Sequence, residues 1–550
     1  MRMTETIPSE VDVVIVGSGA AGMTGAVAAG HAGLSVLVLE STDKWGGTSA
    51  VSGGGFWVPD HGLMETIGMQ DSREDALDYL RHAVGDSGPP TSAANLEAFV
   101  DSGPAFSRFL SDLGMRLEAT LYPDYYQHLP GARVGRGLAS PNVDGREIGA
   151  DLATLRAPPN RLPLVFERSE FLALLAPFRR KRHFLTLARI MLRTLGWKLR
   201  GRAPLNMGMA TMAELMRIAR RFDMTMRLDA DVYGFGMEDG RAAWVRYRHG
   251  GTDHRVRARK AILVAAGGFA RNDAMRRRHQ PVGDAFTATA PGDLGGALVA
   301  GMDLGAQVAL MDESWWMPVV GLPDGTRAIT LTERSMPHSL IVDRAGQRFL
   351  NEAQPYCDCG RAMLDHLGAD HGWLILDSRN RANYAFCTLG ARQSTRPWTD
   401  AGVMIEAPTI ADLARQTGVD ATALTATLDR FNRFARTGVD EDFGRGASSF
   451  DNGWGDPYHG PNPNLGAVEK PPFYAVKIWP GDLGTKGGLL TDADARVLDM
   501  RGEAIPGLYA AGNAAATPMG SCYPGPGGTL GPGMVFAWRA MRHAASMEAS

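Results

Sequence analysis

Residues 523–532 place one phenol, that of Tyr523, in a setting of glycine and proline. Gly lets backbone N–H groups approach a ligand closely, and Pro limits the freedom that is lost when a loop is ordered. A helix predicted from Met534 to about His543 follows, and its first turn offers unpaired N–H groups and partial positive charge. These groups can stabilise an oxygen on which negative charge develops. From this segment alone, a proline-rich loop that only precedes a docking helix remains an alternative.

Two other segments offer phenols beside turn residues. Residues 122–131 cluster tyrosines with Pro and Gly, which predicts an aromatic wall on a loop, although ordinary packing explains it equally well. Residues 346–356 read as a polar turn that places Tyr356. A tyrosine is an unusual base, because its reference pKa of about 10 means that a phenolate near pH 7 needs about 4 kcal/mol of stabilisation. A structural role for Tyr356 therefore stays open.

The amino-terminal residues carry a nucleotide-binding pattern. Residues 11–16 predict a buried parallel strand that enters Gly-Ser-Gly-Ala-Ala-Gly at 17–22, followed by a predicted helix over 23–32 and a strand over 35–39. The first Gly makes the tight turn, the second lets the backbone meet a pyrophosphate, and the third brings helix and strand together. Glu40 can accept from ribose hydroxyls. Strand, glycines, helix and acid together predict a dinucleotide-type cofactor.

A second loop rich in Gly, Ser and Thr, residues 44–55, follows directly. A nicotinamide enzyme has no need of this loop, whereas a flavin ring must be met by backbone amides and hydroxyls, so FAD is the predicted cofactor. Strand-to-glycine turns at 261–268 and 505–513 lead the chain back to the same site, and the Gly-rich segment 292–297 opens another helix there. The predicted FAD-binding residues are Gly17, Gly19, Ala20, Ala21, Gly22, Glu40, Ser41, Gly47, Thr48, Ser49, Ser52, Gly53, Gly54, Gly55, Val232, Ala266, Gly267, Asp293, Gly512, Asn513, Gly528, Thr529 and Leu530.

The composition bounds the protein class. With 550 residues, 44% of them hydrophobic, the chain can bury a large core in two or more domains, and a net charge of -3 argues against a nucleic-acid binder. Its 4 cysteines are too few for a disulfide scaffold and fit a reduced cytoplasm. Cys357 and Cys359 lack the spacing of a zinc site, so no metal is predicted. No apolar run reaches the roughly 18 residues that a membrane span needs.

Residues 178–202 contain nine basic residues and no acid. On a helix, one stripe carries Arg182, Arg189, Arg193 and Arg200, with Phe184, Leu187, Met191 and Leu195 opposite. This pattern is typical of a helix that lies in an anionic lipid surface, and it predicts peripheral contact with the inner face of the cell membrane. The alternatives are a helix packed on the protein with a solvated basic face, and a homodimer contact.

The predicted fold class is α/β, a Rossmann-like FAD-binding domain assembled from both chain ends with an inserted α+β substrate-capping domain. The predicted boundaries are 1–290 for the first part of the FAD-binding domain, 291–468 for the capping domain and 469–550 for the second part. Residues 178–202 form an insertion in the first part. Head and tail of the chain must then meet across the cofactor.

Taken together, these segments resemble the 3-ketosteroid Δ1-dehydrogenases, within the fumarate reductase/succinate dehydrogenase flavoprotein superfamily. The widely shared segments are 17–22, 46–55, 346–352 and 505–512, and the more specific ones are 122–131, 351–356 and 523–532. The resemblance implies FAD-dependent 1,2-dehydrogenation of 3-ketosteroids in steroid degradation. It also implies that Tyr523 and the Gly527 N–H hold the C3 oxygen, and that Tyr356 is the base at C2, helped by Tyr125.

Three other functions remain open from the sequence. They are a 3-ketosteroid Δ4-(5α)-dehydrogenase, a fumarate-reductase-like flavoprotein and a non-catalytic FAD-binding redox partner. A fumarate reductase needs Arg and His side chains that clamp a dicarboxylate, whereas the specific loops of this chain offer tyrosines. The electron acceptor, a quinone or a carrier protein, is not identified by any motif.

Overall fold

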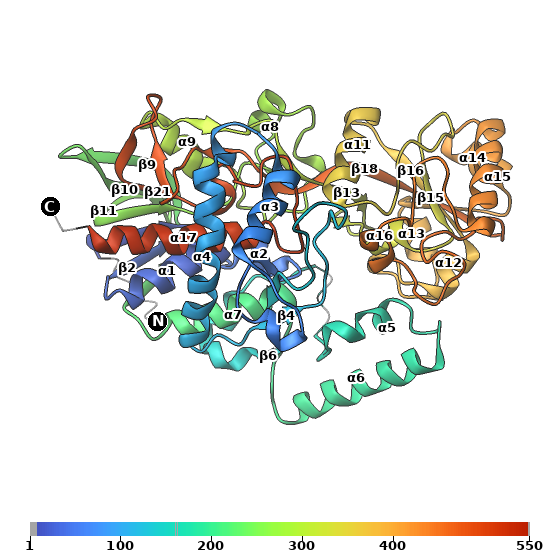
Figure 1. Ribbon diagram of the computed structural model, residues 1–550, viewed down its shortest axis with the longest axis horizontal. Coiled ribbons are helices and arrows are strands. Elements are labelled where there is room, and N and C mark those ends of the chain that lie inside the picture. The colour runs from blue at the N-terminus through green and yellow to red at the C-terminus, as the bar shows by residue number, and fades with distance from the viewer. Residues whose placement is uncertain (1–7, 160, 162, 548–550) are drawn as a thin grey trace.

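The structure is a computed structural model that describes residues 8–159, 161 and 163–547. Two β-sheets, each with its own helices, occupy the two halves of the elongated molecule (Figure 1). Residues 1–7, 160, 162 and 548–550, all within the predicted FAD-binding domain, lie outside the described residues.

The first sheet has a parallel centre in the order β21-β11-β1-β2-β8, to which antiparallel strands are added. Strand β20 pairs antiparallel with β21, while β10 pairs with β11 and with β9. The strands are β1 (Glu10–Val16), β2 (Val36–Leu39), β8 (Met224–Arg227), β9 (Asp231–Glu238), β10 (Arg241–His249), β11 (Thr252–Val264), β20 (Arg496–Leu498) and β21 (Ala504–Ala510). The predicted strands over 11–16, 35–39 and 505–510 are confirmed within one residue at each end. The strand predicted over 261–265 is only the buried end of β11, which begins at Thr252, because its first part is more polar and lies partly exposed.

Both ends of the described chain contribute to this sheet, because β1 lies one strand away from β21. Helix α1 packs against α17 along the same face (Figure 1). The helices around the first sheet are α1 (Ala20–His31), α2 (Gly47–Val51), α3 (Arg73–Val84), α4 (Ala93–Asp112), α7 (Met207–Ala219), α8 (Asp273–His279), α9 (Gly296–Asp303) and α17 (Leu530–Ser546). An α/β fold with a mixed, largely parallel sheet is therefore confirmed.

Helix α17 begins at Leu530, four residues before the predicted start at Met534. Gly531 and Pro532 lie in its first turn. Pro is tolerated there because the first N–H groups of a helix have no intrahelical acceptor, so the proline did not mark the helix boundary.

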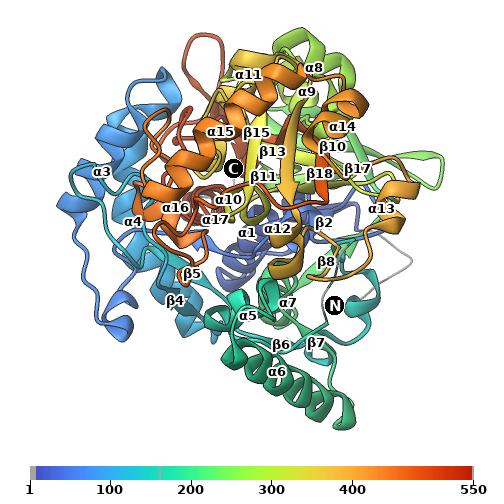
Figure 2. The ribbon, with the colours of Figure 1, turned by 90° about the vertical axis from the view of Figure 1, so that its right-hand side faces the viewer.

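The second sheet is antiparallel, in the order β14-β13-β18-β16-β15, with β17 also paired to β18. Helices α14 and α15 cover one face, and α11 lies on the other (Figure 2). The elements are β13 (Ser314–Gly321), β14 (Arg327–Ile329), α10 (Thr332–Ser335), β15 (Ser339–Val342), α11 (Tyr356–Leu367), β16 (Gly372–Asp377), α12 (Ser378–Asn383), α13 (Arg396–Asp400), β17 (Met404–Ala407), α14 (Ile410–Thr417), α15 (Ala421–Thr437), α16 (Ser449–Gly453) and β18 (Phe473–Thr485). Strand β18 follows the predicted return at residue 469, yet it lies in the middle of this sheet.

Shorter elements fill the space between and below the two sheets. The short strands are β3 (Phe56–Trp57), β4 (Glu118–Thr120), β5 (Gly137–Ala139), β6 (Val143–Asp144), β7 (Pro204–Leu205), β12 (Val308–Ala309) and β19 (Gly488–Leu489). The 3₁₀ helices are Met64–Ile67, Pro89–Thr91, Gly145–Thr154, Arg168–Glu170, Asp284–Phe286 and Gly512–Ala514.

Helices α5 (Phe171–Leu175) and α6 (Lys181–Leu199) form a pair at the edge of the molecule (Figures 1 and 2). The inner face of α6 carries its three buried residues, His183, Ile190 and Thr194. Its outer face is apolar: Phe184, Leu185, Met191, Leu192, Leu195 and Leu199 are each at least 51% exposed. The predicted amphipathic helix is therefore present, with an apolar face that no other described element covers. Among the described helices, none combines the length and apolarity that crossing a bilayer requires.

A buried ion-pair group fixes the loop between β4 and β5. Arg136 is fully buried and contacts Asp71 at 2.6 Å and Asp124 at 2.7 Å. Asp124 also accepts from the indole N–H of Trp57 at 2.8 Å. Because Tyr125 follows Asp124, this group sets where the phenol of Tyr125 lies.

We expect Arg136→Met to destabilise the protein by about 3–5 kcal/mol, because it leaves two buried carboxylates without their cation. Chemical denaturation of the purified protein measures the change. The matched control is Arg396→Met, since the Arg396 side chain is 83% exposed in its pair with Asp400, and an exposed pair contributes at most about 1 kcal/mol. Equal effects of the two substitutions would contradict the structural role of Arg136.

Candidate active site

Three phenols from distant parts of the chain meet where the two halves of the molecule join. The Tyr125 hydroxyl donates to the Tyr356 hydroxyl at 3.1 Å. The Tyr523 ring lies edge-on to Tyr356, with centroids 4.6 Å apart, and is stacked on Tyr125 at 5.4 Å. All three side chains are buried. The structure therefore brings together the three tyrosines predicted as catalytic.

Each tyrosine is held by a different element. Tyr356 is the first residue of α11 rather than part of the predicted polar turn, so it lies at the positive end of a helix. The loop with Tyr523 is fixed at the carbonyl of Pro524, which accepts from the Tyr79 hydroxyl at 2.5 Å and from the Tyr125 N–H at 2.9 Å. The loop that carries Tyr125 thus holds the loop that carries Tyr523 in place.

Two donors remain available beside the tyrosines. The Thr529 hydroxyl donates to the Tyr523 oxygen at 3.3 Å, which leaves the Tyr523 O–H free to donate elsewhere. The Gly527 N–H makes no hydrogen bond with any described residue. Gly527 has φ +98°, and a Cβ atom there would lie 2.5 Å from the carbonyl oxygen of Gly55, so only glycine fits. A phenol and a backbone amide can therefore point at one ligand oxygen.

Burial dominates the electrostatics of the tyrosines. It raises the pKa of Tyr356 well above its ordinary value, and the neighbouring phenols of Tyr125 and Tyr523 add to that rise. The pKa of Tyr125 is also raised, chiefly by burial. The pKa of Tyr523 is raised by burial, against which the hydrogen bond from Thr529 acts. All three groups are therefore neutral phenols at pH 7 in the absence of further charge.

Aromatic side chains that no sequence motif indicated complete the wall of the cluster. Phe450 packs edge-on against Tyr125, with centroids 4.5 Å apart, and Trp315 packs edge-on against Tyr523 at 5.1 Å. The Trp315 N–H donates to Asn513 at 3.0 Å, which links the cluster to the predicted cofactor residues. A small cavity lies beside this link, lined among others by Trp315, Asn513 and Thr529. Because these contacts span hundreds of residues, local sequence patterns could not reveal them.

The predicted FAD-binding glycines have the geometry that a dinucleotide requires. A Cβ atom on Gly17 would lie 2.4 Å from the Ala265 carbonyl oxygen, and one on Gly22 would lie 2.0 Å from the Gly17 oxygen. A Cβ atom on Gly19 would meet only the Ser49 hydroxyl, at 3.4 Å, so this side of the turn is open to a ligand. Gly17 therefore makes the tight turn, Gly19 leaves an open approach for a ligand, and Gly22 allows the helix to pack closely. These are the three roles that the glycines of this motif have.

Two acidic side chains near the glycine-rich turns have oxygens that can accept from a ligand. Asp293 is buried, and neither of its carboxylate oxygens makes a hydrogen bond of ordinary geometry with a described residue, although the Gly268 N–H and the Thr289 side chain lie close enough to act against the rise of its pKa. Burial, followed by the nearby carboxylate of Asp482, raises its pKa to about 7. Glu40 accepts from Ser18 and from Thr42 through its two oxygens, and retains lone pairs for a further donor. A buried carboxylate without a well-placed donor fits a cofactor that brings hydroxyl groups.

Three further residues of the predicted FAD-binding set, Thr48, Ser49 and Gly267, lie beside these groups. The Thr48 hydroxyl accepts from the Ala290 N–H at 2.9 Å, and the Ser49 hydroxyl accepts from the Ala20 N–H at 3.0 Å. A Cβ atom on Gly267 would lie 2.4 Å from the Asp293 carboxylate. The α2 region and the turn after β11 thus face each other across the glycine motif, and the residues present fit FAD.

The comparisons with known proteins agree with this geometry. Residues 12–530 match the family described as FAD binding domain. The chain is 39% identical to the 3-oxosteroid 1-dehydrogenase of Mycobacterium tuberculosis, over 98% of both proteins. It is 34% identical to the 4-oxocyclohexanecarboxylate 2-dehydrogenase of Sinomonas cyclohexanicum, over 98% of this chain and 94% of the relative.

A solved structure is similar over nearly the whole length. It is the 3-ketosteroid Δ1-dehydrogenase of Sterolibacterium denitrificans in complex with 1,4-androstadiene-3,17-dione, with a TM-score of 0.92 and 36% identity over 98% of this chain and 100% of that one. Sequence motifs, cofactor geometry and these relatives lead to the same family. The chain belongs to the 3-oxosteroid 1-dehydrogenases, within the FAD-binding fumarate reductase/succinate dehydrogenase flavoproteins.

Proposed function

We propose that Tyr523, Gly527, Tyr356 and Tyr125 carry the reaction of this enzyme, the FAD-dependent 1,2-dehydrogenation of 3-ketosteroids. The observation that carries the assignment is the 3.1 Å hydrogen bond between the hydroxyls of Tyr125 and Tyr356, beside the Tyr523 ring and the unused Gly527 N–H. Two donors on one side and a hydrogen-bonded phenol pair on the other suit a cyclic ketone whose neighbouring carbon must lose a proton.

The reaction begins at the ketone. Hydrogen bonds from the Tyr523 O–H and the Gly527 N–H to the C3 oxygen make the C2 proton more acidic, because the electrons left behind spread onto that oxygen. The Tyr356 oxygen takes the C2 proton, and the Tyr125 O–H donates to Tyr356 to stabilise its negative charge before the transfer. FAD, when bound, would supply the acceptor for the C1 hydride, and loss of this hydride together with the C2 proton leaves C1 and C2 doubly bonded.

The aromatic surroundings favour a steroid over a charged substrate. Among the described residues, the rings that contact the three tyrosines, apart from one another, are those of Phe450 and Trp315. A dicarboxylate would need cations in this position, which disfavours the fumarate-reductase alternative. A Δ4-(5α)-dehydrogenase would use the same ketone but form a different double bond, so product analysis separates the two regiochemistries.

In this proposal the predicted FAD-binding residues supply the cofactor contacts. We assign the pyrophosphate to the turn around Gly17 and Gly19, and the ribityl hydroxyls to Asp293, whose buried oxygens otherwise have no well-placed donor among the described residues. The half of the molecule built on the second sheet acts as the capping domain, because it supplies Tyr356 and Phe450 to the cluster. Strand β18 lies at the centre of this sheet, so we extend the capping domain through Thr485.

The outer face of α6 supplies a membrane contact in this proposal. Its exposed apolar residues are flanked by Arg182, Arg189 and Arg200, an arrangement that combines apolar insertion with attraction to anionic headgroups. Arg193 is an exception to the predicted basic stripe, because it donates to the Val165 carbonyl at 2.8 Å and pairs with Glu170. A lipid surface on the cytoplasmic side would bring the enzyme close to an apolar substrate and to a quinone acceptor.

Tyr523→Phe removes one donor to the ketone oxygen. We expect the rate of flavin bleaching on anaerobic mixing with androst-4-ene-3,17-dione to fall by about 10²–10³-fold. Stopped-flow absorbance measures the rate, and the product is checked for the 1,4-diene. The control is Tyr474→Phe, a buried tyrosine of β18 in a different hydrophobic cluster. An unchanged rate in Tyr523→Phe would contradict the assignment.

Tyr356→Phe removes the base. We expect loss of solvent exchange at C2 and a fall in flavin reduction of about 10²-fold or more. Tyr125→Phe keeps the base but removes its donor, so it should slow exchange less than Tyr356→Phe does. Exchange is followed by mass spectrometry in deuterated water. Wild-type exchange in Tyr356→Phe would assign the base to another group.

Leu192→Asp introduces a charge into the exposed apolar face of α6, where Leu192 is 68% exposed. We expect the variant to lose co-sedimentation with vesicles that contain phosphatidylglycerol, while flavin reduction by steroid in solution is retained. Leu121→Asp is the matched control, because Leu121 is 66% exposed outside α6. Equal binding of both variants to vesicles would count against the membrane contact.

A further inference from the structure

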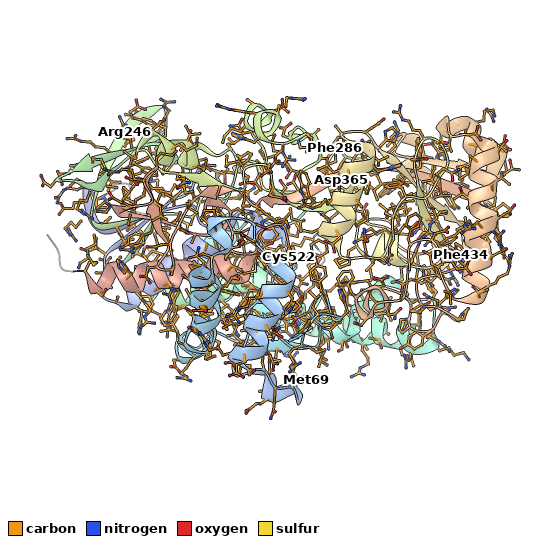
Figure 3. The ribbon with its side chains drawn as sticks, turned by 45° about the horizontal axis from the view of Figure 1, so that its top comes forward. Met69, Arg246, Phe286, Asp365, Phe434 and Cys522 are labelled. Carbon is orange, nitrogen blue, oxygen red and sulfur yellow. The ribbon has the colours of Figure 1, made fainter. Side chains whose placement is uncertain are left out.

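One buried cation lies behind the tyrosine cluster and has no part in the steps above. Lys486 follows β18 and has no exposed surface. Its Nζ donates to the carbonyl of Cys522 at 2.8 Å and lies 4.5 Å from the centroid of the Trp315 ring. Cys522 lies centrally in the molecule (Figure 3). The ammonium is therefore held by one carbonyl and one aromatic face.

The charge of Lys486 is not cancelled by a carboxylate. Among the salt bridges of the described residues, none includes Lys486, and the nearby Glu313 is paired with Arg361 at 2.6 Å. The titratable groups that face the ammonium are the thiols of Cys357 and Cys522, the carboxyl groups of Glu313 and Asp358, and the guanidinium of Arg361. Asp358 accepts from the Tyr126 hydroxyl at 3.0 Å and makes no salt bridge with Lys486. Burial lowers the pKa of Lys486, while the thiols and Glu313 act against that shift. A buried charge without an opposite charge is unfavourable for folding. Such a group is kept for a reason other than stability.

The contacts of Lys486 lead to both reacting tyrosines. Cys522 precedes Tyr523, and Cys357 follows Tyr356 in the chain. The Trp315 ring that lies under the ammonium is edge-on to Tyr523 at 5.1 Å. These groups share one hydrophobic cluster with Tyr125, Tyr356 and Tyr523, where water does not screen charge. The ammonium therefore lies beside this cluster, with the Trp315 ring and the Cys522 backbone between it and Tyr523.

Resting on the proposed function, we propose that Lys486 is a positioning residue whose fixed positive charge stabilises the negative charge that the reaction creates on Tyr356 and on the steroid oxygen. Its hydrogen bond to the Cys522 carbonyl also holds Tyr523 in place. The charge acts through space, because the ammonium touches neither the substrate nor a reacting atom.

The positive charge of Lys486 would help the buried Tyr356 to act as a base. Burial holds Tyr356 in its neutral form, yet Tyr356 must lose its proton before it can accept one from C2. A nearby positive charge favours the phenolate and lowers the pH at which the base becomes active. Removing the charge raises the apparent pKa of the base, so the rate should continue to rise at a higher pH than in the wild type.

The test uses the FAD-loaded enzyme with Lys486→Met and Lys486→Gln. The Met side chain removes charge and donor, whereas the Gln amide can still donate to Cys522 without a charge. We expect kcat to fall by about 10-fold or more with a smaller change in KM, a loss below that for removal of a direct oxyanion donor. We also expect the rising limb of the pH profile to move to higher pH. The melting temperature should be equal or higher, because a buried unpaired charge is removed.

Two further variants make the result decisive. Lys486→Arg keeps the charge, and we expect it to retain the wild-type pH profile even where kcat is lower. Lys477→Met is the matched control, since Lys477 lies on β18, is exposed, and sits 5.7 Å over the Trp373 ring. If Lys486→Met does not fold, Lys486→Gln and Lys486→Arg carry the comparison of pH profiles.

A wild-type kcat and pH profile in Lys486→Met or Lys486→Gln would overturn the inference. A profile displaced equally in Lys486→Arg and Lys486→Gln would also overturn it, because the charge would then not matter. If Tyr523→Phe and Tyr356→Phe keep wild-type rates, the proposed function of the cluster fails instead. The two failures are therefore distinguishable.

Discussion

The structure depends on holding three phenols in a dry pocket at the junction of its two halves. Burial strengthens every hydrogen bond that the phenols make, but it also raises their pKa values and so disfavours the charged state that proton abstraction requires. Positive charge has to be supplied without admitting water. The chain offers it in two forms, the amino-terminal end of α11 at Tyr356 and the ammonium behind Trp315.

Rigidity of the same pocket comes from contacts between loops. The Pro524 carbonyl receives donors from Tyr79 and Tyr125, while Asp124 is held by Arg136 and Trp57. The loop with Tyr523 and the loop with Tyr125 therefore cannot move independently. Because oxyanion stabilisation needs donors that are in place before charge develops, this mutual fixation is a condition of the chemistry rather than a by-product of packing.

Local sequence patterns predicted those turns and strands whose conformation depends on residues close together in the chain. The glycines at 17–22 and the strands beside them form as expected, since turn geometry and burial act over a few residues. The start of α17 was wrong because Pro532 is compatible with a first helical turn. Phe450, Trp315 and Lys486 escaped prediction, because they join the site through contacts between segments more than a hundred residues apart or carry no motif.

Helix α6 shows a different limit of sequence periodicity. The spacing of Arg182, Phe184 and Met191 defines two faces, but it does not say which face turns toward the protein. In the structure a third face, with His183, Ile190 and Thr194, packs inward, and the apolar face is left outward. A helix stabilised by packing alone would place its largest apolar side chains inside. The outward arrangement is the reason why we propose a lipid contact for this face, since a lipid surface would also concentrate the steroid that this enzyme dehydrogenates.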